Sequence, residues 1–119
     1  MKSLRINDHV FHLHVAKTPD EMTASLNNTR TMPSNQGMIF VFAQEGMYSV
    51  STQGMHFPVD VLWLDNDGFV VDMQTDVRPG TPYSIHSRFL AHYIVIVHAG
   101  AARSARIERG TYIFLPNLN

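Results

Sequence analysis

The chain opens on an alternation of apolar and polar residues that predicts a β-strand. Positions 11, 13 and 15 are apolar within residues 9–15, and a period of two places such side chains on one buried face. Residues 4–6 can pair with this strand through Asn7-Asp8, a pair suited to a two-residue turn. We therefore expect an antiparallel hairpin at the beginning of the chain.

The next segment changes to the signature of a helix start. Thr18 can cap a helix and Glu21 can close a capping box, with proline at the first helical position between them. Met22 and Leu26 lie four residues apart and give the helix an apolar stripe. The pattern predicts one short helix over residues 18–27.

The rest of the chain is a series of short runs rich in β-branched and aromatic residues. Residues 38–42 are continuously apolar, which favours a buried strand, and residues 47–51 suit its return strand. Residues 58–64 and 69–73 flank an Asp-Asn-Asp-Gly cluster and predict the clearest hairpin. Further strands are expected at 92–98, apolar on both faces and therefore central, and at 110–115.

Turn signals separate these runs. Proline and glycine predict a loop over 74–84, and the small residues of 99–109 suit a single helical turn. Short strands with one helix predict a mainly β fold, a β-sandwich or partly open barrel, with a short N-terminal helix around residues 18–27. With 119 residues and no repeat, we expect a single domain over 1–119.

Composition excludes several classes of protein. No cysteine is present, so neither a disulfide framework nor a cysteine metal site is available. A net charge of −1 argues against a nucleic-acid binder, which needs a basic face. The apolar runs are too short for a membrane helix, and the N-terminus lacks the apolar core of a signal peptide. A cytoplasmic or virion location is the expectation.

The fraction of charged residues suggests a protein that associates. It is 16%, against about 25% in a typical globular domain. A surface short of lysine and glutamate is poorly defended against association. Ordinary drift in composition would also explain the low fraction of charged residues. The alternative interpretation is a surface that lies inside an assembly, with a second copy of the chain or another protein as the partner.

Several runs together resemble the DUF192 family, small domains of unknown function. The resemblance rests on the helix start at 18–21, the Gly-Met-Ile-Phe-Val-Phe run at 37–42, the Pro-Val-Asp run at 58–60, the Asp-Gly-Phe-Val-Val run at 67–71 and the glycines at 100 and 110. It covers nearly the whole chain. It implies a mainly β fold with one helix near the N-terminus, and no established reaction. Relatives occur in phage genomes, so it also allows a phage particle component.

The chain departs from the family where a polar site could lie. A Trp-Met-Lys-Asn-Thr run is usual there, and Gln53 and Gly54 replace its Lys and Asn. Thr29 stands where the family has an arginine, with Arg30 one residue late. Any family site built on these residues is therefore largely lost in this chain.

Asp60 is the strongest candidate for a site residue. It lies between two valines in an apolar strand, where a carboxylate is costly unless it is paired or hydrogen-bonded. It serves either a ligand, with His56 and Arg30 nearby as ligand-binding residues, or the fold, as an acceptor for backbone or arginine donors.

The sequence gives little support for a metal site, a catalytic nucleophile or a nucleotide-binding site. His12 with His14, and His92 with His98, share strand faces but do not form a set of three or four metal ligands. Asp65 and the following turn residues fit hairpin chemistry better than a calcium loop. No nucleophile, nucleotide or dinucleotide motif is present, and no metal or cofactor is expected.

We therefore expect a non-enzymatic structural or interaction module, self-assembling or part of a phage particle. The alternative is a small-ligand-binding or hydrolytic enzyme with Asp60 and His56 converging in a pocket. No catalytic residue is assigned in either case.

Overall fold

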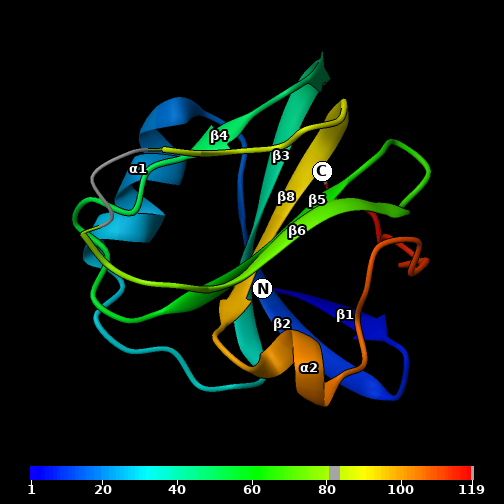
Figure 1. Ribbon diagram of the computed structural model, residues 1–119, viewed down its shortest axis with the longest axis horizontal. Helices are drawn as coiled ribbons and strands as arrows, with labels where there is room; N and C mark the ends of the chain where they lie inside the picture. Colours follow the sequence, from blue (N-terminus) through cyan, green and yellow to red (C-terminus); the bar gives the residue numbers. More distant parts are fainter. Residues whose placement is uncertain (81–83, 119) are drawn as a thin grey trace.

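A six-stranded sheet forms the centre of the molecule in a computed structural model that describes residues 1–80 and 84–118 (Figure 1). Neighbouring strands are antiparallel except for the parallel pair β2 and β3. In spatial order the strands are β1 (Lys2–Ile6), β2 (His9–Ala16), β3 (Gln36–Gly46), β8 (Ala91–His98), β5 (Val59–Leu64) and β6 (Val70–Val77).

Both predicted hairpins are confirmed. Ile6 pairs with His9 across the first turn, where Asn7 has a φ of 53°, a conformation that asparagine tolerates better than most residues. In the second hairpin, Leu64 pairs with Val70. Asp65 closes this turn by accepting the backbone N–H groups of Asp67 and Phe69.

The predicted helix is confirmed as α1 (Pro19–Asn28), and it connects the parallel strands β2 and β3. Thr18 Oγ1 accepts the Glu21 N–H at 3.1 Å, and Glu21 Oε1 accepts the Thr18 N–H at 3.0 Å. This is the predicted capping box. A parallel pair requires such a crossover connection, because a tight turn can join only antiparallel strands.

Apolar side chains are buried on both faces of the sheet. One face packs against α2 (Ala101–Ser104) and the C-terminal segment. The other packs against α1 and a two-stranded sheet of β4 (Ser49–Val50) and β7 (Ile85–His86). β8 is central as predicted, and Ile94 to Val97 are fully buried. The fold is mainly β with open sheets, and α2 is the single turn expected within 99–109.

Two strand predictions are wrong, the first in its partner strand and the second because no strand forms. Residues 47–51 do not return along β3, because β2 and β8 occupy the two sides of β3; β4 pairs with β7 instead. Residues 110–115 form no strand beyond a bridge between Phe69 and Tyr112. The loop expected at 74–84 begins only after Val77, and residues 81–83 of it lie outside the described part of the chain.

Candidate functional site

Asp60 is buried, with 1% of its surface exposed, and backbone groups occupy both of its carboxylate oxygens. Oδ1 accepts the Asp76 N–H at 2.9 Å, and Oδ2 accepts the N–H groups of Gly100 and Ala102 at 3.0 Å each. Asp60 therefore joins β5 to the bulge in β6 and to the start of α2. It also lines a hollow of about 380 Å³ together with Arg103.

The structure does not bring His56 to Asp60. His56 is exposed, and its Nε2 donates to the Asn27 carbonyl at 2.8 Å, at the end of α1. Helix α1 packs on one face of the sheet, whereas the α2 region that binds Asp60 packs on the other face. Arg30 is exposed and makes no hydrogen bond or ion pair within the described residues.

The histidines lie in separate surroundings. His12 Nδ1 bonds to Ser3 Oγ at 3.0 Å, and the His98 ring stacks on Phe57. Among residues 1–80 and 84–118, no group of three or more His, Asp or Glu residues is placed to hold a metal ion.

Asp72 is a second buried acid, which sequence reasoning missed. It is 3% exposed and lies on β6, where Arg88 donates to it from Nη2 at 2.8 Å, from Nε at 3.2 Å and from the backbone N–H at 2.9 Å. The guanidinium of Arg88 holds the pKa of Asp72 below its usual value, despite the opposing effect of burial. The pair fixes residues 87–89 against β6.

Large aromatic side chains are exposed beside this pair. Phe69 contacts Tyr112 with ring centroids 5.1 Å apart, and the Arg109 guanidinium lies 4.8 Å from the centroid of Phe89. Arg109 also donates to the Val71 carbonyl of β6 at 3.1 Å. We call this surface the aromatic face and define it by five residues: Phe69, Phe89, Arg109, Tyr112 and Phe114.

The C-terminal segment brings these residues together. Gly110 donates to the Val70 carbonyl at 2.8 Å, and Ile113 donates to the Gly68 carbonyl at 2.8 Å. Ile113 is fully buried, whereas Tyr112 and Phe114 on either side of it are 51% and 73% exposed. Figure 1 shows this segment beside the β5–β6 turn, on the side of the molecule away from α1.

A groove of about 420 Å³ lies between α1, β3 and β4. Met22, Leu26, Phe40 and Phe42 supply apolar walls, and serine, threonine, asparagine and glutamine side chains supply polar groups. Within the described part of the chain, no charged side chain lines this hollow. We call it the neutral groove.

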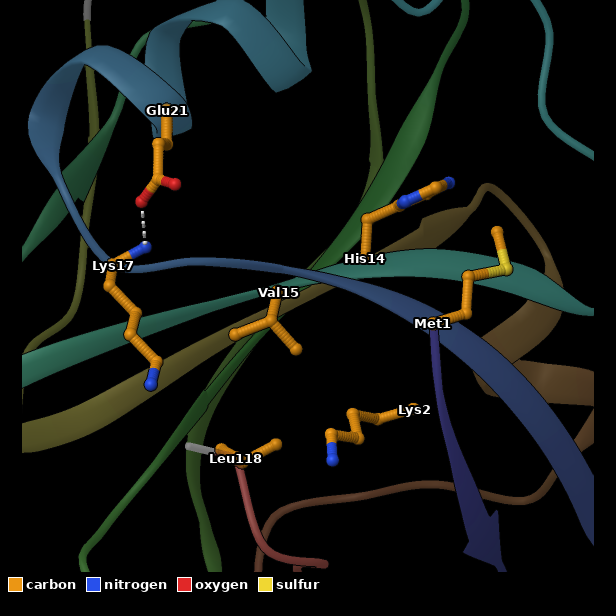
Figure 2. A pocket seen from close by; sticks show the side chains of 7 residues that line it. All are labelled: Met1, Lys2, His14, Val15, Lys17, Glu21 and Leu118. Atoms are coloured by element: carbon orange, nitrogen blue, oxygen red, sulfur yellow. Dashed lines mark hydrogen bonds between the residues drawn. The ribbon is translucent and has the colours of Figure 1, made fainter.

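A third hollow, of about 410 Å³, has a basic rim (Figure 2). Lys2, His14 and Lys17 line it, with Val15 and Leu118 as apolar neighbours. Glu21 lines the same hollow. The backbone N–H groups of Lys17 and Thr18 bind its carboxylate and hold its pKa below the usual value.

Part of these surfaces could have been predicted from short stretches of the sequence. Gln53 lies in the run that departs from the family pattern, and this residue lines the neutral groove. The contact between Phe89 and Arg109 joins residues 20 positions apart, and no pattern in a short window specifies it.

Comparison with known proteins places the chain among uncharacterised domains. The profile of DUF192, described as Uncharacterized ACR, COG1430, matches residues 2–115. No curated protein matches the sequence. In the described residues, no helix is long and apolar enough to cross a membrane.

Two solved structures share the fold. One is described as a "putative transcription regulator" from Sinorhizobium meliloti 1021, with a TM-score of 0.86 and 21% identity over 94% of this chain and 89% of that one. The other is a protein of unknown function from Novosphingobium aromaticivorans DSM 12444, with a TM-score of 0.86 and 18% identity over 95% of this chain and 82% of that one.

Proposed function

The chain belongs to the DUF192 family, and on that premise we propose that it is a non-enzymatic interaction module that associates with a second copy of itself through the aromatic face. The observation that carries this proposal is the exposure of four aromatic rings on neighbouring segments, where Phe69 packs against Tyr112 and Phe89 packs against Arg109. Phe69, Phe89 and Tyr112 are 42% to 51% exposed and Phe114 is 73% exposed. Aromatic residues and arginine are the types that dominate the binding energy of protein interfaces.

The charges around the aromatic face favour a second copy as the partner. Arg88 and Arg109 both contact the Phe89 ring. Among the exposed acids, Asp67 lies two residues before Phe69 and Glu108 lies directly before Arg109 in the chain. In a two-fold interface the same surface meets itself, so arginines of one copy can face acids of the other. A net charge of −1 also leaves little repulsion between copies.

The alternative, a ligand-binding or hydrolytic enzyme near Asp60, has less support. Backbone donors occupy both oxygens of Asp60, and His56 lies on the other face of the sheet. A component of a phage particle stays a prediction. DNA binding of the kind suggested by one neighbour's description would need a basic surface, and here nine basic residues are offset by ten acidic ones.

Light scattering after size exclusion tests the proposal. The expected mass at about 0.1–1 mM protein, the range in which modest interfaces are populated, is twice the 13.5 kDa of one chain. The double variant Tyr112→Ser with Phe114→Ser removes two exposed rings without opening the core and should have the mass of one chain.

Val10→Ser is the matched control. Val10 is 47% exposed on β2, outside the aromatic face, so this variant should associate like the wild type. A wild-type mass of one chain over the whole concentration range would overturn the proposal. So would a double variant that still associates, because the interface would then lie elsewhere.

A further inference from the structure

We propose that the neutral groove between α1, β3 and β4 is a binding site for an uncharged, planar aromatic molecule that carries a hydrogen-bonding group. The groove is lined by residues of α1, β3 and β4. Figure 1 shows α1 and β4 on the side of the molecule away from the C-terminal segment, which carries most of the aromatic face. The groove's volume of about 420 Å³ is within the range of small-molecule sites. This inference does not depend on self-association.

The lining selects against ions. The described residues that form the groove are all uncharged. An ion that enters such a site loses hydration and finds no opposite charge, whereas a neutral polar group loses much less. The site should therefore distinguish ligands by charge more sharply than by shape.

An aromatic platform is already fixed in the groove. Phe42 lines it, and the Tyr48 ring stacks on Phe42 with centroids 3.6 Å apart and planes within 8° of parallel. Tyr48 is held in turn: its hydroxyl donates to the Gln44 carbonyl at 2.6 Å, and its own carbonyl accepts Trp63 Nε1–H at 2.9 Å. A ring held in this way can bind a second ring with little loss of conformational freedom.

Polar groups are placed to orient such a ring. Asn27 lines the groove, and the turn at Gly54 packs against its side chain. A Cβ at position 54 would collide with the Asn27 amide oxygen, so the glycine leaves room for this amide at the end of α1. Ser49 and Ser51 line the same groove with hydroxyls, which can both donate and accept. An amide or hydroxyl on the ligand can therefore be satisfied.

Three probes with the same ring test the proposal: benzamide, benzoate and benzylammonium. Their binding is measured by chemical-shift changes in ¹H–¹⁵N spectra of the whole chain. Benzamide should saturate with a Kd on the order of 1 mM, as expected for a fragment of this size. The shifts should centre on Met22, Leu26 and Phe42, and the two ions should bind about tenfold more weakly or worse.

Variants locate the site and its selectivity. Phe42→Leu keeps an apolar side chain but removes the ring, and it should weaken benzamide binding about fivefold. Thr23→Glu places a negative charge in the groove and should reverse the order of affinities: benzamide should bind more weakly than to the wild type, and benzylammonium more tightly. Ala24→Glu is the matched control, because Ala24 is exposed on the same helix and does not line the groove; it should change neither affinity.

Several outcomes would overturn the proposal. Equal affinity for benzoate and benzamide would contradict the role of the neutral lining. Shifts centred on another surface, or no saturable binding of benzamide in spectra that show a folded chain, would contradict the site itself. If Phe42→Leu disturbs the fold, the exchange of preference in Thr23→Glu decides the matter alone.

Discussion

At the scale of single residues, Asp60 shows how a buried charge can serve the fold. Its carboxylate accepts the backbone N–H group of Asp76 in β6 and those of Gly100 and Ala102 at the start of α2. Hydrogen bonds to a charged group contribute more to stability than hydrogen bonds between neutral groups. Without these bonds, both the carboxylate and the backbone donors would be buried without partners, at a further cost in free energy. The acid thereby replaces backbone partners that regular secondary structure does not supply here.

We expect Asp60→Asn to lower the free energy of unfolding by about 2 kcal/mol, because the amide loses the charge and one of its two acceptor atoms. Urea denaturation followed by circular dichroism measures this. Asp8→Asn, an exposed turn residue, should stay within about 0.5 kcal/mol of the wild type. An unchanged urea midpoint for Asp60→Asn would show that these hydrogen bonds do not support the fold.

At the scale of elements, the β5–β6 turn and the C-terminal segment depend on each other. Gly68 has a φ of +97° and its carbonyl accepts the Ile113 N–H at 2.8 Å. A Cβ at Gly68 would collide with the Ile113 carbonyl oxygen. The turn must therefore carry glycine both for its backbone conformation and for the close approach of the other segment.

Gly68→Ala should lower the free energy of unfolding by about 2 kcal/mol and should increase hydrogen exchange at the Ile113 amide. Gly110→Ala separates the two causes. Gly110 also has a positive φ, 91°, but nothing lies within 4 Å of a Cβ built there, so this variant should lose only about 1 kcal/mol. Equal losses in both variants would show that the contact with Ile113 adds nothing.

Sequence reasoning was most successful for elements. The capping box at Thr18 and Glu21, the two hairpins and the central strand all follow from residues close together in the chain. The return strand at 47–51 failed because the sides of β3 were already occupied by β2 and β8. A pattern of apolar residues predicts a strand but does not say which strand lies beside it.

At the scale of the whole molecule, stability couples to pH through the pair of Asp72 and Arg88. Arg88 lowers the pKa of Asp72 in the folded chain, so between the folded and unfolded values only the unfolded chain binds the proton. The pair therefore stabilises the fold fully when the pH is above the pKa of Asp72 in the unfolded chain, about 4. This stabilisation is lost as the pH falls through the lower pKa that Asp72 has in the folded chain.

We expect the free energy of unfolding to fall as the pH drops below about 4, and to fall less steeply in Arg88→Met. Methionine keeps an apolar stem near Phe89 but removes the guanidinium that lowers the pKa of Asp72. Urea titrations of both proteins at several pH values measure the difference. Parallel pH profiles would show that Asp72 and Arg88 do not account for the acid sensitivity.

The candidate sites were less predictable than the fold. Asp60 stood out because its charge interrupts an apolar strand, yet whether it faces a ligand or backbone donors depends on α2, some 40 residues later in the chain. The expected convergence of Asp60 and His56 did not occur, because the intervening residues carry them to opposite sides of the sheet. Nearness in sequence does not set direction across a sheet.

The sequence by itself determined the local elements and the residues available for burial, since periodicity, capping and turn chemistry act over a few residues. Only the tertiary structure decided the order of strands, the pairing of β4 with β7, and the meeting of Phe89 with Arg109 and of Phe69 with Tyr112. These contacts join distant positions. Their choice depends on which sheet edges and apolar surfaces are left after the rest of the chain has packed, and no short window of sequence contains that information.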